Sequence, residues 1–244
     1  MSYDDISSGE KDELDDALFV ENDDLDKDFK EYTEAIKLDP TDASAYRNRG
    51  LIYVFEGQYD LAIQDFTEAI RLEPENFLAY GIRAITYKGN GQYDLAIKDY
   101  TEMIKLNQES DFTYNLRGEI YRKQGQYDLA IGDFTEAIRL DPDNSSIKVD
   151  VSTCYYFNRA NAYVDKGQHD LAIKDYTDSI RLNPEFAAAY ASRGNAYSKK
   201  GQRDLAIKDQ TEANRLDPNR FKTPGLSQEE MDELLAAVKR DKNR

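Results

Sequence analysis

The sequence of 244 residues is poor in chemically versatile side chains: it contains one cysteine, Cys154, one histidine, His169, and no tryptophan. A single cysteine excludes an intramolecular disulfide and fits a reducing compartment. One histidine and one cysteine are too few for a metal cluster built from these residues, and they leave little room for a nucleophile paired with a base. We therefore expect no catalytic residues, no metal and no cofactor, and we expect that the protein is not an enzyme.

Long apolar runs and an excess of basic residues are also missing. Charged residues make up 33% of the chain, and no apolar run approaches the length that crosses a membrane. The first residues, MSYDDISSGEKDELDD, do not resemble a secretory signal, so a cytoplasmic location is expected. The net charge is −16, and residues 1–31 contribute 13 acidic side chains against three lysines. Nucleic acid is not expected as a partner, because phosphate binding needs a net basic surface.

What the sequence has in abundance is repetition. The segment GQYDLAIQDFTEAIRLEP at 57–74 is followed by four near-copies, and successive copies start 34, 34, 42 and 34 residues apart. A period in this range is typical of stacked helical arrays, in which each repeat contacts only its neighbours. Such arrays present a long surface to another molecule, so the repetition indicates a binding scaffold.

Each period is predicted to form two helices. In the first copy, a helical segment that contains Tyr46 and Tyr53 breaks at Gly57, where a glycine suits a left-handed C-terminal cap. A second apolar stripe begins near Asp60 and ends at Pro74, because proline cannot continue a helix. Small residues recur at one position of each helix, so the two helices are expected to approach closely.

The residues that recur carry a family resemblance. In the first copy they are Tyr46, Gly50, Tyr53, Gly57, Ala62, Phe66, Ala69 and Pro74. The pattern returns in the later copies with isolated departures, such as Gln108 for the proline and Gln210 for an aromatic residue. It resembles the tetratricopeptide repeat over residues 43–220. The resemblance implies an all-α fold, a right-handed α-α superhelix (solenoid) of five repeats, and a scaffold that holds a protein or peptide without catalysis.

The repeats divide the chain into four parts. Residues 1–24 form an acidic N-terminal segment, and residues 25–42 fit a degenerate half repeat. The five repeats occupy 43–220, with an insertion at 145–152 that either extends a helix or forms a loop. Residues 221–244 are predicted to form a C-terminal capping helix and a tail.

Two opposite charges recur in every copy at a fixed offset. The arginines are Arg49, Arg83, Arg117, Arg159 and Arg193, and the aspartates are Asp65, Asp99, Asp133, Asp175 and Asp209. They form either a charged ladder that meets a ligand or a set of partly buried, bidentate pairs between helices. Equal numbers of opposite charges favour the pairs.

Positions that vary between copies are the candidates for recognition. In the family that this pattern resembles, the first helix of each repeat usually lines a concave groove. That resemblance places the following residues in the groove: Arg47, Leu51, Phe55, Leu78, Ile85, Lys88, Phe112, Asn115, Glu119, Arg122, Phe157, Asn161, Asp165, Asn195 and Lys199. Apolar members can hold side chains of an extended peptide, asparagine amides can bind its backbone, and arginine or lysine can bind a carboxylate. The alternative is that these residues are only solvated.

Two other functions are open. The chain can instead be a structural adaptor that associates with a second copy through a terminal repeat. Alternatively, LSQEEMDELLAAV at 226–238 resembles the short helix by which the flagellar motor switch protein binds a chemotaxis response regulator, although Met231 and Glu233 depart from that helix. As a simpler interpretation, this segment is a capping helix with an apolar stripe that packs on the last repeat.

Overall fold

The computed structural model describes residues 25–141 and 149–218, and over these residues it contains eleven α-helices and no β-strand. The helices are α2 (Leu25–Leu38), α3 (Ala43–Phe55), α4 (Tyr59–Leu72), α5 (Phe77–Gly89), α6 (Tyr93–Leu106), α7 (Asp111–Lys123), α8 (Tyr127–Leu140), α9 (Val149–Asp165), α10 (His169–Leu182), α11 (Ala187–Lys199) and α12 (Arg203–Leu216). The predicted all-α repeat solenoid is confirmed. The predicted N-terminal segment 1–24, the first half of the insertion and the C-terminal helix lie outside the described residues.

Each first helix ends in the same glycine cap. Gly57 has a φ of 73°, and the glycines at 91, 125, 167 and 201 have φ values between 73° and 76°. After α3, the Gln58 amide donates to the Tyr53 carbonyl at 2.8 Å, and the Gly57 amide donates to the Val54 carbonyl at 3.0 Å. This pair of bonds is a Schellman motif, which satisfies the last carbonyls of the helix and requires a left-handed residue. The glycine therefore turns the chain from the first helix into the second.

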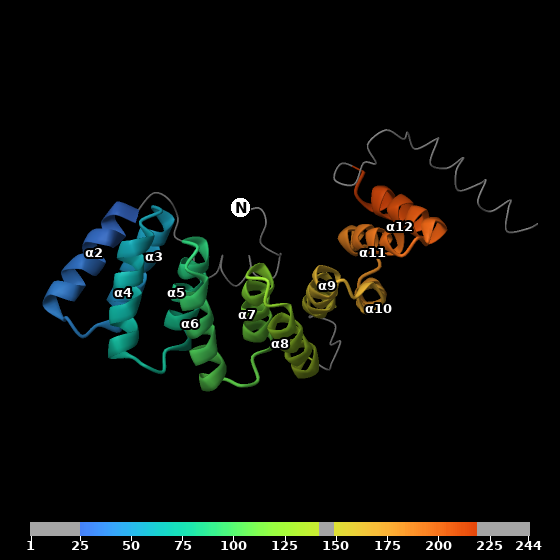
Figure 1. The fold of residues 1–244 in the computed structure, drawn as a ribbon. Coiled ribbons are helices and arrows are strands. Elements are labelled where there is room, and N and C mark those ends of the chain that lie inside the picture. The colour runs from blue at the N-terminus through green and yellow to red at the C-terminus, as the bar shows by residue number, and fades with distance from the viewer. Residues whose placement is uncertain (1–24, 142–148, 219–244) are drawn as a thin grey trace, which may run out of the picture. The chain divides into compact units, whose positions relative to one another are not determined.

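The described residues divide into two compact units, with the boundary between residues 120 and 121, and each unit is described separately. In the first unit, each of the helices α2 to α6 packs on the next in chain order (Figure 1). A Cβ atom added to Gly50 would lie 2.6 Å from Cε1 of Phe66, which confirms the predicted close approach of α3 and α4. Any larger residue at position 50 must displace the fully buried Phe66 ring.

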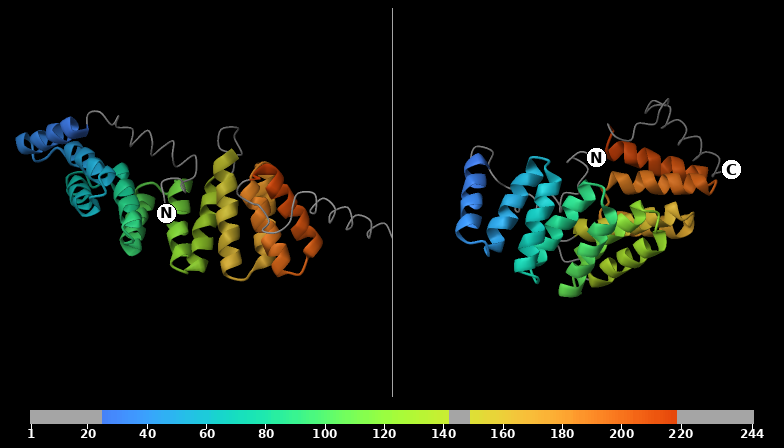
Figure 2. Two further views of the ribbon diagram at one scale, coloured as in Figure 1. Left: turned by 90° about the horizontal axis from the view of Figure 1, so that it is seen from above. Right: turned by 60° about the vertical axis from the view of Figure 1, so that its left-hand side comes forward.

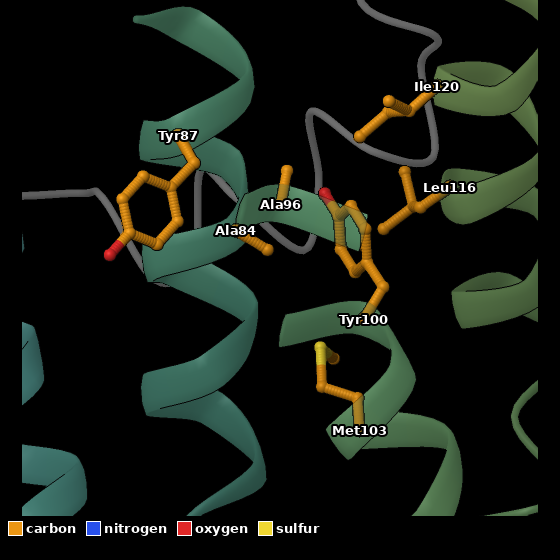
Figure 3. Packing of buried hydrophobic residues seen from close by; sticks show 7 residues of the cluster. All are labelled: Ala84, Tyr87, Ala96, Tyr100, Met103, Leu116 and Ile120. Carbon is orange, nitrogen blue, oxygen red and sulfur yellow. The ribbon is translucent and has the colours of Figure 1, made fainter. Parts of the chain in front are cut away.

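The core of the first unit is built from alternating small and aromatic residues. Figure 3 shows the Tyr100 ring of α6 between Ala84 of α5 and Leu116 of α7. Tyr100 and Ala84 are fully buried, and Ile120 completes the contact on α7. Small residues let the helices approach, and the rings fill the space that remains between them.

In the second unit, helices α8 to α12 also pack in chain order, as Figures 1 and 2 show. Ala160, Ala172, Tyr176 and Ala196 form a core cluster equivalent to that of the first unit. Helix α9 has 17 residues, whereas the other first helices have 13. Its extra turn, residues 149–152, is the second half of the predicted insertion. This half extends the helix by one turn.

Candidate peptide-binding surface

The recurring arginines and aspartates pair with each other. Arg83 donates from Nε to Asp99 Oδ2 at 2.8 Å and from Nη2 to Asp99 Oδ1 at 2.7 Å. Bidentate bonds of 2.7–3.0 Å also join the arginines at 49, 159 and 193 to their aspartates. The aspartate side chains in these four pairs are only 4–8% exposed. The predicted pairing is confirmed for these copies.

Further contacts complete the environment of each guanidinium group. Arg83 Nη1 donates to Thr67 Oγ1 of the preceding repeat at 2.9 Å, and its Cζ lies 5.8 Å and 5.7 Å from the ring centroids of Tyr80 and Tyr87. Burial opposes the charge on Arg83, but the hydrogen bonds and the attraction of Asp99 outweigh it and raise the pKa of the guanidinium. This arginine is therefore committed to holding three helices together and is not available to a ligand.

Sequence reasoning missed the threonine partners. Arg117, Arg159 and Arg193 make the same bond to a threonine of the preceding repeat at 3.0–3.1 Å. A signal was present, because a threonine follows the ladder aspartate by two residues in all five copies. The contact crosses from one repeat to the next, so the offset within one copy does not reveal it.

On the first helices of the first unit, five candidate residues are large and apolar. Phe55 is 58% exposed and Leu78 is 47% exposed. Leu51, Ile85 and Phe112 are half-buried on α3, α5 and α7. Two of the apolar residues that the resemblance assigned to a groove, Phe55 and Leu78, are therefore accessible to solvent.

The polar candidates of the first unit contact one another. Lys88 Nζ lies 3.2 Å from Glu119 Oε2, an ion pair between α5 and α7. The Asn115 Nδ2 amide donates to Glu119 Oε1 at 3.3 Å, and Asn115 is 5% exposed. The structure thus places Asn115 inside the helix layer. By contrast, Arg47 on α3 is half-buried and has no ion-pair partner among the described residues.

The candidates of the second unit are paired in a similar way. Arg122 Nη1 lies 2.7 Å from Asp165 Oδ2, and the Tyr176 hydroxyl donates to Asn161 Oδ1 at 2.6 Å. Burial raises the pKa of Tyr176 to about 12. Phe157 packs with its ring centroid 5.6 Å from that of Tyr176. Asn195 and Lys199, which lie on α11, are exposed.

The two residues that were weighed for chemistry lie on neighbouring helices of the second unit. His169 is half-buried at the start of α10, and Cys154 is half-buried on α9. Within residues 25–141 and 149–218, no three histidine, cysteine, aspartate or glutamate side chains come together as metal ligands. In the same part of the chain, no helix combines the length and apolar character needed to span a membrane.

Family models for the tetratricopeptide repeat match residues 43–76, 66–98, 112–144 and 187–220, and a further model, described as TPR repeat, matches 160–201. Together with the paired helices and their glycine caps, these matches decide the family. The chain belongs to the tetratricopeptide repeat family. This family provides protein-interaction scaffolds and is generally not enzymatic. No curated protein matches the sequence.

Solved structures of tetratricopeptide repeat proteins share the fold. The MamA protein is 26% identical with a TM-score of 0.63, and the alignment covers 76% of this chain and 96% of MamA. The C-terminal part of a repeat protein from Cytophaga hutchinsonii is 18% identical with a TM-score of 0.70, covering 94% and 89% of the two chains. YrrB, a TPR protein whose structure is described as having an unusual peptide-binding site, is 19% identical with a TM-score of 0.61, covering 86% and 97%. The last two likenesses concern the fold alone.

Proposed function

We propose that this scaffold binds an extended peptide, or a peptide-like segment of a protein, on the first helices of residues 43–120. The observation that carries the proposal is the exposure of Phe55 and Leu78, the most exposed large apolar residues of α3 and α5. Leu51 and Ile85, at matching positions of α3 and α5, are half-buried beside them. Exposed aromatic and aliphatic side chains on the first helices of successive repeats provide shallow apolar sites for alternate side chains of an extended ligand.

The charges of this surface favour an acidic group in the peptide. Helices α3 and α5 contain no acidic residue, and their basic residues outside the arginine ladder are Arg47 and Lys88. Arg47 is unpaired within the described chain, whereas Lys88 is shared with Glu119. We therefore infer that Arg47 binds a carboxylate of the ligand. Lys88 would contribute only when its ion pair with Glu119 breaks.

A peptide-display selection against the full chain, followed by calorimetric measurement of the selected peptides, tests this function. The site variant is Phe55→Asp with Leu78→Asp. Its matched control is Leu61→Asp with Leu95→Asp, because these leucines are 40% and 37% exposed on the second helices of the same unit. We expect at least about a tenfold loss of affinity in the site variant and no loss in the control, as for removal of central interface residues. The opposite pattern would place the binding surface on the second helices.

Self-association is the second candidate function. A leucine in the first turn of every second helix is 37–52% exposed, namely Leu61, Leu95, Leu129, Leu171 and Leu205. Single exposed leucines are ordinary, but five at one repeat position give each unit an apolar stripe. A concentration series in light scattering separates the functions, because the Leu61→Asp, Leu95→Asp variant should reduce assembly only if these leucines form the contact.

A further inference from the structure

Helix α2 has the length of the second helices but lacks their burial. It contains 14 residues, as do α4, α6, α8, α10 and α12, and each of those helices buries three to five residues. Helix α2 buries none. Tyr32, Ala35 and Ile36 stand 34 residues before buried residues of α4, and all three are only half-buried. We call these three residues the open face of α2.

The chain that leads into α2 carries the apolar pattern of a first helix. The apolar residues Leu18, Phe19 and Val20 stand one repeat length, 34 residues, before Ile52–Val54 of α3. Three residues, 22–24, then remain before α2, and three residues also separate α3 from α4. The same register would bring residues 11–21 to the face of α2 that corresponds to the face of α4 covered by α3.

Aspartates occupy four signature positions of this segment. Asp12 stands at the position of the first tyrosine, and Asp15 stands at that of the ladder arginine. Asp16 stands at the position of the small residue, and Asp23 stands at that of the capping glycine. The five complete copies never place an acidic residue at any of the four.

Each replacement weakens docking for a physical reason. Asp15 would oppose Glu31, which stands at the position of the ladder aspartate, so attraction becomes repulsion. Asp16 would enter a site so tight that even a Cβ atom on Gly50, its counterpart, lies 2.6 Å from a neighbouring ring. Asp23 would need a positive φ, which is costly for a residue other than glycine.

We propose that residues 11–21 dock on the open face of α2 as the first helix of a terminal repeat, and that the four aspartates keep this docking weak. An apolar contact would support the docking on the α3 side. Lys88 contacts Glu119, and Val20 and Leu51 stand at the same two repeat positions, each 68 residues earlier. The open face is thus a displaceable surface at the end of the array, next to Leu51 of the proposed peptide-binding surface. A helix that displaces residues 11–21 from α2 would need an arginine and a glycine at the two positions that Asp15 and Asp16 occupy.

Hydrogen exchange of the full chain tests the proposal. The repaired variant Asp15→Arg, Asp16→Gly, Asp23→Gly restores three signature residues. The control variant Asp4→Gly, Asp5→Arg, Glu10→Gly changes the net charge by the same amount outside the segment. We expect the amides of residues 29–36 to exchange at least about ten times more slowly in the repaired variant and unchanged in the control, because docking suppresses local opening of α2. Amides of α6 serve as the internal reference.

Two further measurements identify the occupant. Adding Leu18→Asp and Val20→Asp to the repaired variant should return α2 to the exchange rate of the native chain. In the native chain, the same two substitutions should accelerate exchange of α2 and leave α6 unchanged. Equal exchange of α2 in the repaired and control variants would overturn the proposal. Protection of α2 that rises with protein concentration would also overturn it, by assigning the open face to a second copy.

Discussion

Replacing Arg83 by alanine removes one rung of the arginine–aspartate ladder in the first unit. The side chain of Asp99 is 5% exposed, and in the native chain both its oxygens accept from Arg83 at 2.7–2.8 Å. The substitution leaves that carboxylate buried without its cation, removes the bond to Thr67 Oγ1 and opens the space between two tyrosine rings. These losses concern the packing of α4, α5 and α6.

The expected cost follows from the burial of the carboxylate. Removing one partner of a buried ion pair typically costs about 3–5 kcal/mol, because the remaining charge stays desolvated. Arg83 keeps 14% of its side-chain exposure, so water can reach Asp99 after truncation. We therefore expect a loss of about 3 kcal/mol in the free energy of unfolding. The double variant Arg83→Ala, Asp99→Ala should lose less than Arg83→Ala alone, because it leaves no buried charge.

Urea titration followed by circular dichroism measures these losses. Arg71→Ala is the control, because Arg71 is exposed and pairs with Glu68 only along one helix; this variant should be indistinguishable from the parent. Burial raises the pKa of Asp99 even in the native chain, where Arg83 opposes the shift, so the carboxyl of Arg83→Ala should protonate more readily. The deficit of the variant should therefore shrink as the pH falls toward about 4. The structural role of the ladder would be refuted if Arg83→Ala unfolded like Arg71→Ala and its difference in stability from the parent did not change with pH.

Other substitutions test the packing and the buried phenol. In the same urea titration, Gly50→Ala should destabilise the chain by about 1–3 kcal/mol through overpacking against Phe66. Gly132→Ala should stabilise it by about 0.5–1 kcal/mol, because a Cβ at this position in α8 meets nothing within 4 Å. The neutral phenol of Tyr176 is favoured in the folded chain, so its contribution is complete below pH 10 and is lost as the pH rises toward 12. Between pH 10 and about 12, the free energy of unfolding should fall less steeply for Tyr176→Phe than for the parent. Equal slopes in the two proteins would contradict a raised pKa for this tyrosine.

The fold was predictable because its determinants are local. A break at Gly57 was expected from the glycine alone, and α3 ends two residues earlier with Gly57 at a φ of 73°. A left-handed residue is needed whatever surrounds it, so sequence suffices to locate the turn. The Arg83–Asp99 pair was also accessible, since both residues lie in one repeat and recur at one offset.

The candidate surface was less predictable because its contacts run between repeats. Asn115 was expected to offer its amide to a peptide, yet it is buried and bonded to Glu119. Lys88 was expected to hold a carboxylate of a ligand, and it already holds that of Glu119 on another helix. A position that varies between copies can therefore be a contact to the next repeat. Only the relative placement of α5 and α7 distinguishes that role from display to solvent.

Recurrence among the copies is evidence of packing only when burial accompanies it. Ala62 and its counterparts recur as small residues because another helix lies against them, and Ala62 is fully buried. Leu61 recurs beside it in every copy, yet it is 40% exposed, and its four counterparts are 37–52% exposed. Packing within the described repeats accounts for the alanine but not for the leucine. The leucines are thus the part of the repeat pattern that the fold leaves unexplained, and they are the natural control when binding to Phe55 and Leu78 is measured.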